Sequence, residues 1–320
     1  MKKWIAFCIA VGCALTASVL QAQTWPQRPV KVIVPFAAGG STDSQARIVS
    51  DRLSAVFGQQ FLVENRLGAG GAIAAEFVAK APADGYTLFF STVSQILILP
   101  LVQKVGYDPM KDFAPISIVS TNPLVIGVHP SLPVKTLKEL VDHAKTRPGQ
   151  MNYASNGSGT LGHLSTVLFL SRAGLQMTHV PYKSSAQLMV DLIGGQVEIF
   201  FGPPSDFIQH AKAGKITLLA VSSEKRMRQF PDLPAIAEIY PGFRTVTWNG
   251  YLAPVATPKP IIDRLAQEIA KIVREPATVE RLVTIGVDPL GNTPAEFFEF
   301  VRRDAPTWRA AVDTAGVKQE

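Results

Sequence analysis

The chain has 320 residues, is 47% hydrophobic and carries a formal net charge of +6 at pH 7. This length allows one or two domains with a sizeable apolar core. The Lys and Arg residues are scattered, without a basic run interleaved with aromatic residues, so the composition argues against nucleic-acid binding and suits an anionic small ligand.

The N-terminus has the three parts of an export signal. Two lysines precede an apolar run that ends near Val19, and the small residue Ala22 follows shortly after. We therefore expect residues 1–22 to be a cleaved signal peptide and the mature protein to be periplasmic. A lipoprotein acylated at Cys13 is the alternative. Both cysteines of the chain lie in this segment, so the mature protein would have neither a disulfide nor a thiol nucleophile.

The first elements after the signal are a strand, a glycine-containing turn and a helix. The apolar run 30–34 predicts a buried strand, and apolar residues at helical spacing predict a helix over 44–57 that Gly58 closes. Thr42 and Gln45 have the spacing of a capping box, which places the helix start near Thr42. Free N–H groups and the helix dipole favour an anion at such a turn.

Short apolar runs and helical patterns alternate along the rest of the chain. The expected strands are 61–65, 86–90, 116–120, 124–128, 151–154, 179–182, 197–201, 216–221 and 246–254. The expected helices are 72–80, 137–145, the segments after Thr160 and Ser184, a short one after Asp206, 261–273, 277–285, and 294 to the C-terminal end. This alternation predicts an α/β fold with a mostly parallel sheet and helices on both faces.

Two glycine-rich turns are the best candidates for a binding site. The second turn, Ser155–Thr160, combines three hydroxyls, two glycines and an Asn, which is more donor capacity than a turn needs. Two lobes that face each other across a cleft would place helix N-termini on both sides of a bound anion. The candidate ligand-binding residues of these turns are Phe36, Ala38, Gly39, Gly40, Ser41, Thr42, Asp43, Ser155, Asn156, Gly157, Ser158, Gly159 and Thr160.

Other motifs in the sequence are incomplete matches to cofactor-binding, catalytic or metal-binding patterns. Gly68-Ala69-Gly70 lacks the third glycine of a dinucleotide fingerprint and suits helix–sheet packing. Neither Ser41 nor Ser158 sits in a nucleophile elbow, and His163 is interpreted as a helix-surface or packing residue. The histidines lack zinc-site spacing, so we expect no metal and no cofactor. Trp248 and Tyr251 either line the cleft or pack a hinge, and the sequence leaves both options open.

Several motifs of the sequence resemble those of a known protein family. The run 32–43, Val-Ile-Val-Pro-Phe-Ala-Ala-Gly-Gly-Ser-Thr-Asp, resembles the start of the Bug-type extracytoplasmic solute receptors, the substrate-binding proteins of tripartite tricarboxylate transporters. Further matching motifs cover essentially the whole mature chain in order. They are 63–66, 68–71, 84–88, 107–109, 112–115, 179–183, 213–215, 231–234, 253–254 and 257–260.

The resemblance implies a two-lobed periplasmic binding protein with a ligand cleft between the lobes. Residues 23–120 and 251–320 would form lobe 1, and residues 121–250 would form lobe 2. The two glycine-rich turns would hold a ligand carboxylate, and the loop at Ser91 and Thr92 and the turn at Tyr182 would complete the pocket.

One loop departs from the family pattern. An acidic residue and an Asn are frequent where this chain has Gly202-Pro203, and here the acid comes later, at Asp206. Asp206 facing inward would select a ligand amine or hydroxyl. Asp206 facing outward would leave the Gly202-Pro203-Pro204 wall, which suits an apolar or aromatic tail.

We therefore expect a non-catalytic, monomeric receptor that captures a carboxylated small molecule by hinge closure, such as a dicarboxylate, an aromatic acid or an amino acid. Its partners would be integral-membrane transporter subunits or a sensor protein. The competing hypothesis is a secreted hydrolase or isomerase that acts on an organic acid through Asp43 or His163. The turns are rich in neutral donors and poor in paired acid–base groups, which favours the receptor.

Overall fold

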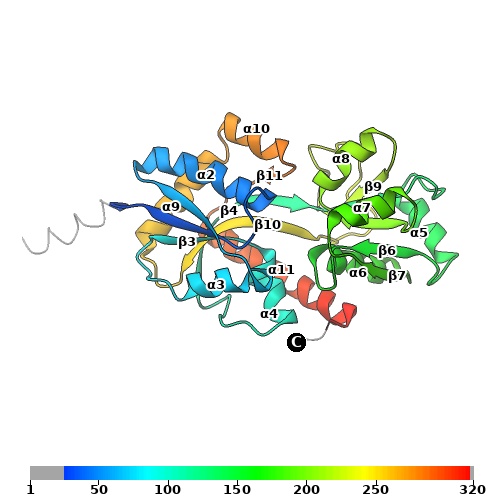
Figure 1. The fold of residues 1–320 in the computed structure, drawn as a ribbon, viewed down its shortest axis with the longest axis horizontal. Coiled ribbons are helices and arrows are strands. Elements are labelled where there is room, and N and C mark those ends of the chain that lie inside the picture. The colour runs from blue at the N-terminus through cyan, green and yellow to red at the C-terminus, as the bar shows by residue number, and fades with distance from the viewer. Residues whose placement is uncertain (1–24, 318–320) are drawn as a thin grey trace, which may run out of the picture.

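The computed structural model describes residues 25–317, which form two lobes side by side, each built on one mixed β-sheet (Figure 1). The predicted signal peptide, residues 1–22, and the alternative acylation site Cys13 lie outside the described residues. Among helices within residues 25–317, none combines the length and the apolar character that crossing a membrane requires.

The sheet of the first lobe has the strand order β11-β4-β10-β3-β1-β2. β1 pairs in parallel with β2 and β3, whereas β10 runs antiparallel to both β3 and β4. The strands of this sheet are β1 (Val30–Val34), β2 (Phe61–Asn65), β3 (Thr87–Thr92), β4 (Phe113–Pro123), β10 (Val246–Pro254) and β11 (Asp288–Pro289).

Helices cover both faces of this sheet because its central strands are apolar on both sides. In β1, Val30, Val32 and Val34 face one apolar cluster, and Ile33 faces the other, as the two-residue period of a strand requires. The first cluster includes α2 (Ser41–Phe57) and α9 (Lys259–Ile272), with α10 (Pro276–Thr284) beside them. The second cluster includes α3 (Ala72–Ala79), a π-helical turn (Ser94–Ile98), α4 (Leu99–Val102) and α11 (Pro294–Ala315).

The sheet of the second lobe has the order β7-β6-β8-β5-β9, with β6 parallel to β7 and β8 and with β5 antiparallel to β8 and β9. Its strands are β5 (Val125–Val128), β6 (Asn152–Ser155), β7 (Thr178–Pro181), β8 (Ile199–Gly202) and β9 (Thr217–Val221). Its helices are α5 (Leu137–Lys145), α6 (Leu161–Ala173), α7 (Ser185–Ile193) and α8 (Pro204–Lys212), with a 3₁₀ turn at Ile236–Glu238.

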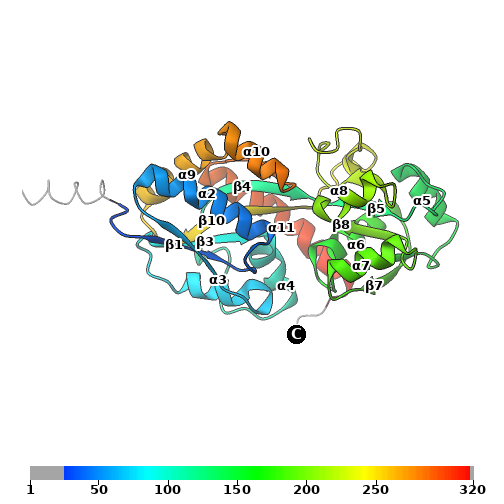
Figure 2. The ribbon, with the colours of Figure 1, turned by 45° about the horizontal axis from the view of Figure 1, so that its top comes forward.

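Three segments join the two lobes. The chain leaves the first sheet through β4 and enters the second through β5 after a single residue, and β10 brings it back (Figures 1 and 2). The long helix α11 reaches from the first lobe to the second, where Trp308, Ala311 and Val312 share an apolar cluster with Leu164 of α6. The lobes are therefore connected by two paired strands and by packing of the C-terminal helix.

The predicted α/β fold with two lobes is confirmed, and most predicted elements lie within about two residues of the observed ones. The prediction of a mostly parallel sheet is wrong. Both sheets are mixed, because β10 runs antiparallel to β3 and β4 in the first sheet and β5 runs antiparallel to β8 and β9 in the second. The expected break at Asn122 and Pro123 does not interrupt the strand, since β4 continues through Pro123 opposite Val246.

The prediction of a capping box at the start of the first helix is also wrong. α2 begins at Ser41, its N-cap is Gly40, and no side chain caps it. Gln45 caps no backbone N–H, because its buried Oε1 accepts from Ser120 on the crossing strand β4 and its Nε2 donates to Ser41 Oγ (3.2 Å). The predicted C-terminal stop is confirmed: Gly58 takes the left-handed conformation, with φ of 65°.

Candidate functional site

Two neighbouring hollows form one cleft between the lobes. The larger hollow has a volume of about 880 Å³ and the smaller one about 280 Å³. They share Asn122, Thr160, Leu161 and Thr247 in their linings, so they are two parts of the same space. Concave sites of this size between lobes are where small-molecule ligands bind.

The crossing strands form the floor of the cleft. Asn122 of β4 and Thr247 of β10 are paired in register and line both hollows. Asn249, two residues further along β10, lines the larger hollow. These three residues are absent from the sequence-based site. The signal that could have found them is their polar character on two strands whose residues are mostly buried.

The first glycine-rich turn contributes Phe36 and Thr42 to the larger hollow and Ser41 to the smaller one. The backbone N–H groups at the start of α2 have no intrahelical partners, as at the start of any helix, and no side chain caps them. Such groups, together with the positive end of the helix dipole, attract an anion. The N-terminus of α2 is therefore an electropositive end that opens at the cleft.

The shape of this turn is held by Asp43, which is buried under it. The Asp43 carboxylate accepts hydrogen bonds from the Gly39 N–H (2.9 Å), from Asn65 Nδ2 (2.8 Å) and from the Arg47 guanidinium (2.9 and 3.0 Å). Burial would raise the pKa of Asp43, but the hydrogen bonds from Arg47, Gly39 and Asn65 together lower it below its ordinary value. Asp43 lies outside both linings, and its oxygens are occupied by the protein itself.

The second glycine-rich turn contributes Ser158, Gly159 and Thr160 to the larger hollow and Asn156 to the smaller one. Much of its donor capacity is used internally. Thr160 Oγ1 donates to the Gly157 carbonyl (2.7 Å) and caps α6 by accepting from the His163 N–H. No hydrogen bond of the Ser158 hydroxyl is found among the described residues, and this hydroxyl faces the space shared with α11.

A pair of stacked histidines supports the second turn from behind. The rings of His163 and His179 lie 4.0 Å apart, and Tyr153 stacks on His179 at 4.9 Å. His163 Nδ1 accepts a hydrogen bond from the Gly159 N–H (3.1 Å), and His179 Nε2 lies 2.7 Å from Ser155 Oγ. Burial, followed by the proximity of His179, lowers the pKa of His163 to about 4, so the pair is neutral at pH 7.

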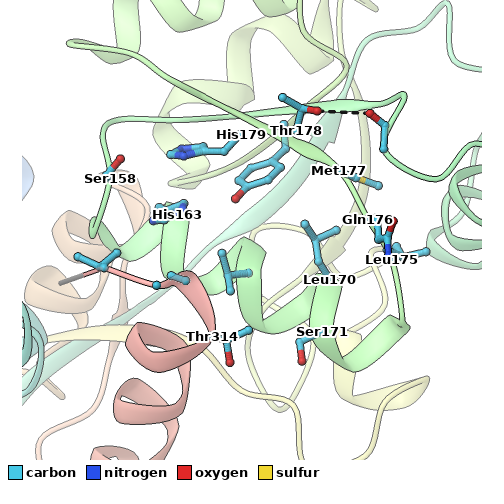
Figure 3. Close-up of a pocket in the computed structure, with 16 residues that line it drawn as sticks. Ser158, His163, Leu170, Ser171, Leu175, Gln176, Met177, Thr178, His179 and Thr314 are labelled. Carbon is cyan, nitrogen blue, oxygen red and sulfur yellow. Dashed lines mark hydrogen bonds between the residues drawn. The ribbon is translucent and has the colours of Figure 1, made fainter.

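These histidines line a third cavity of about 830 Å³ between the second turn, α6 and the end of α11, and this cavity shares Ser158 and Val317 with the larger hollow (Figure 3). Figure 3 shows His163 and His179 on one side and Thr314 of α11 on the other, with Ser158 at the rim. His163 is thus a packing residue, as one of the two sequence interpretations held.

Several predicted site residues lie outside the linings of both hollows. Ser91 and Ser155 are fully buried, and the Ser91 hydroxyl lies near Gln95 Oε1. The Tyr182 hydroxyl donates to Asp191 of α7 (2.8 Å). The predicted residues outside the linings are Ala38, Gly39, Gly40, Asp43, Ser91, Ser155, Gly157, Tyr182 and Asp206, and those within them are Phe36, Ser41, Thr42, Thr92, Asn156, Ser158, Gly159 and Thr160.

The loop around Asp206 presents its prolines to the cleft. Pro203, Pro204 and Ser205 line the smaller hollow, and Asp206 does not. The Asp206 carboxyl lies in the first turn of α8 against Ser185, and burial raises its pKa in spite of the Ser185 and Ser205 hydrogen bonds. Of the two orientations that the sequence left open, the structure shows the apolar wall.

Trp248 and Tyr251 pack the molecule and do not line the cleft. Trp248 lies edge-on against Phe297 of α11, with ring centroids 4.9 Å apart. The Tyr251 hydroxyl lies 3.0 Å from Ser50 Oγ inside the core of the first lobe. Among the described residues, no group of three or more His, Cys, Asp or Glu residues has a geometry that could hold a metal ion.

The chain is similar to a family of solute receptors over most of its length. Residues 45–317 match the model of the tripartite tricarboxylate transporter family receptor. Protein BugT of Bordetella pertussis is 36% identical over 97% of this chain and 96% of its own length.

Solved structures of the same type have the same fold. Rpa4515 of R. palustris, solved with adipate, is 37% identical, covers 92% of this chain and 100% of its own, and has a TM-score of 0.78. MatC from Rhodopseudomonas palustris, solved with bound malate, is 29% identical, covers 90% and 100%, and has a TM-score of 0.73. Both are bound to carboxylates.

Proposed function

Since the chain belongs to the tripartite tricarboxylate transporter family of receptors, we propose that it captures an organic acid in the cleft between its lobes. The members of this family are solute-binding receptors, so the chain is a binding protein and not an enzyme. The hydrolase or isomerase hypothesis is thereby set aside. The Asp43 oxygens, which it would use as a base, are held by Arg47, Asn65 and Gly39.

The uncapped N-terminus of α2 is the observation that carries the proposal. Its free N–H groups open at the cleft beside Ser41 and Thr42, and a carboxylate bound there would supply the cap that the protein lacks. Ser158 of the facing lobe offers a neutral hydroxyl donor to the same group, whereas the Thr160 hydroxyl already donates to the Gly157 carbonyl. A carboxylate so placed would contact both lobes.

The rest of the cleft suits an acid with an apolar part. Among the described residues, Lys104 is the one charged side chain in the linings of the two hollows. The smaller hollow is largely apolar, with Leu124, Leu161, Phe201, Pro203, Pro204, Ile285 and Val287 in its lining. Similar receptors were solved with adipate and with malate, which fits a carboxylate ligand.

Capture would proceed by closure of the lobes around the acid. We propose lobe boundaries at residues 23–120 with 251–320 and at residues 121–250, which place the bending points in β4 and β10. Ligand contacts from both lobes stabilise only the closed state, so binding shifts the population toward it. The closed form would then be presented by a periplasmic monomer to membrane transporter subunits, or to a sensor protein.

Thermal unfolding of the mature protein against a panel of mono-, di- and tricarboxylates and aromatic acids tests the proposal. An acid at 100 times its dissociation constant stabilises a fold by about 2.7 kcal/mol, which raises the melting temperature measurably. Matched alcohols and amides of the same carbon skeletons are the controls and should give no shift. A panel in which no acid raises the melting temperature, or in which the neutral analogues raise it equally, would contradict carboxylate capture.

A further inference from the structure

Asn249 stands apart from the other polar residues of the cleft floor. Its side chain is buried, with 1% of the residue exposed, yet neither its Nδ2 nor its Oδ1 has a hydrogen-bond partner. A carboxamide buried in this way costs free energy unless something supplies the missing hydrogen bonds. An unsatisfied polar group of this kind calls for an explanation, and where it also lines a cleft a bound ligand can supply the missing hydrogen bonds.

The neighbours of Asn249 are already paired. In the sheet it lies opposite Thr92 of β3 and Ser120 of β4. Thr92 Oγ1 donates to Gln95 Oε1 (2.9 Å), and the Ser120 hydroxyl donates to Gln45. The hydroxyls of Thr92 and Ser120 thus have hydrogen-bond partners, whereas the Asn249 amide between them has none.

Strand geometry directs this amide toward the cleft. Side chains two residues apart on a strand share a face, and Thr247 and Asn249 both line the larger hollow. Trp248, between them, packs on the opposite face against Phe297. The Asn249 side chain therefore belongs to the cleft-facing row of β10, near the turns that receive the carboxylate in the proposed function.

We infer that Asn249 recognises a hydroxyl group on the bound acid, so that the receptor selects hydroxycarboxylates over the corresponding acids without the hydroxyl. This inference rests on the proposed function. A carboxamide offers one acceptor and two donors, and a hydroxyl both donates and accepts. A second carboxylate would only accept, and an ammonium would only donate, so each would leave one side of the amide unsatisfied.

The experiment measures dissociation constants by calorimetry for matched pairs: malate and succinate, 2-hydroxyglutarate and glutarate, mandelate and phenylacetate. The wild type should bind the hydroxylated member of at least one pair about tenfold more tightly, the value of one good net hydrogen bond. Asn249→Leu, which keeps the size but removes the polar atoms, should bring that ratio close to one while the non-hydroxylated acid still binds.

The melting temperature of the ligand-free variant gives a second readout. Because Asn249→Leu removes an unsatisfied buried amide, it should unfold at a higher temperature than the wild type. A lower melting temperature would mean that the amide is satisfied inside the protein, by an ordered water for example, and would overturn the inference. Asn249→Ala is the second variant, and it should lose the hydroxyl preference in the same way.

Thr245→Val is the matched control. Thr245 is also buried, at 1% exposed, with an unpartnered hydroxyl, but it lies outside the linings of both hollows. Its variant should keep the hydroxyl preference. Two results would overturn this inference and leave the proposed function intact. One is a wild type that binds acids of these pairs without preferring the hydroxylated member. The other is an Asn249→Leu protein that keeps the preference for the hydroxylated acid. If the wild type binds none of these acids and no acid of the thermal panel either, the proposed function is contradicted, and this inference with it.

Discussion

Asp43 ties together three segments that are distant in the sequence. Its carboxylate bonds the glycine-rich turn through Gly39, the helix α2 through Arg47 and the end of β2 through Asn65, whose amide also donates to the Phe36 carbonyl (2.9 Å). The sequence interpretation gave Asp43 a helix-dipole role or a place in the ligand site. Neither the pairing with Asn65 nor the burial could be read from local spacing, because β2 meets the turn only in the folded sheet.

We expect Asp43→Ala to lower the free energy of unfolding by about 2 kcal/mol, because it leaves Asn65 and the Gly39 N–H without their acceptor. Urea unfolding of the ligand-free protein measures this change. Asp51→Ala, an exposed carboxylate on the same helix, is the control and should change the free energy of unfolding by less than about 0.5 kcal/mol. Equal losses in the two variants would contradict the role given to Asp43.

The lowered pKa of Asp43 also predicts a pH dependence. A group whose pKa is lower in the folded than in the unfolded state stabilises the fold above its unfolded pKa, about 3.9, and this contribution is lost as the pH falls through the folded value. Acid unfolding of the wild type should therefore be steeper below about pH 4 than that of Asp43→Asn. If the wild type and Asp43→Asn lost stability equally steeply below about pH 4, this prediction would be contradicted.

The buried His163 predicts a different pH window. Its pKa is about 4 in the folded state and about 6.5 when unfolded, so the unfolded chain binds more protons between these values. Stability should fall by up to about 3 kcal/mol as the pH drops from about 6.5 to about 4. His163→Gln should flatten this slope, and half-buried His143→Gln should not. Melting temperatures across this range check it, and a slope unchanged in His163→Gln would refute it.

At the scale of elements, a side-chain cap at the start of α2 would have opposite effects on the stability of the fold and on acid binding. The N-cap Gly40 has φ of −72° and ψ of 167°, which any residue can adopt, and a Cβ there would lie 3.4 Å from the Ala37 carbonyl oxygen at closest. A side-chain cap is therefore sterically possible at this position and absent. An uncapped helix start at a cleft is the arrangement expected where a ligand supplies the cap.

We expect Gly40→Asp to raise the free energy of unfolding by about 0.5 kcal/mol, through capping and reduced chain entropy, and to abolish acid binding. The new carboxylate would occupy the N–H groups and repel the ligand charge. Gly40→Ser should be as stable but should weaken acid binding less, because its cap is neutral. Urea unfolding and calorimetry on both variants test this. Acid binding by Gly40→Asp at wild-type affinity would rule out α2 as the carboxylate site.

The elements themselves could largely be predicted, since apolar periodicity and glycine stops are local signals. The interval 137–145 was predicted as a helix and matches α5. Ser184 was predicted as a cap, and its hydroxyl accepts the Gln187 N–H. Strand direction was not predictable, because it depends on how the chain crosses between the lobes. The prediction of a mostly parallel sheet was wrong for that reason.

The binding site was predictable only in part. Ser41, Thr42 and Ser158–Thr160 line the cleft and stood out as turn residues with unusual donor content. Asn122 and Thr247 did not stand out, because their meaning depends on a pairing between strands more than a hundred positions apart. We predict that the residues that line the cleft bind the acid, and the experiments described above test this.

At the scale of the whole molecule, a buried ion pair lies between the crossing region and α11. The Arg244 guanidinium, just before β10, bonds the Asp304 carboxylate on α11 and lies over the Phe300 ring, with 4.4 Å from its Cζ to the ring centroid. Both side chains are largely buried, with 15% and 9% exposed. The pair fixes the C-terminal helix against the start of the returning strand.

We expect Asp304→Asn to lower the free energy of unfolding by about 3 kcal/mol, because it leaves the Arg244 charge buried without its partner. The double variant Arg244→Met with Asp304→Leu should recover most of that loss, since a well-packed apolar pair can replace a buried ion pair. Chemical denaturation of the three proteins measures both steps. A double variant less stable than Asp304→Asn would show that the pair contributes more than packing can replace.

The packing of α11 against the second lobe would also limit how the lobes move in the proposed closure. Two neighbouring strands alone would act as a flexible ribbon, free to bend and to twist about its own length. A third contact, off the line of the ribbon, resists the twisting mode and leaves bending as the soft degree of freedom. Val317, two residues after that helix, lines the larger hollow near Gly159 of the second turn. In the proposed closure, the packing of α11 would therefore bring the two halves of the site together in the same alignment each time.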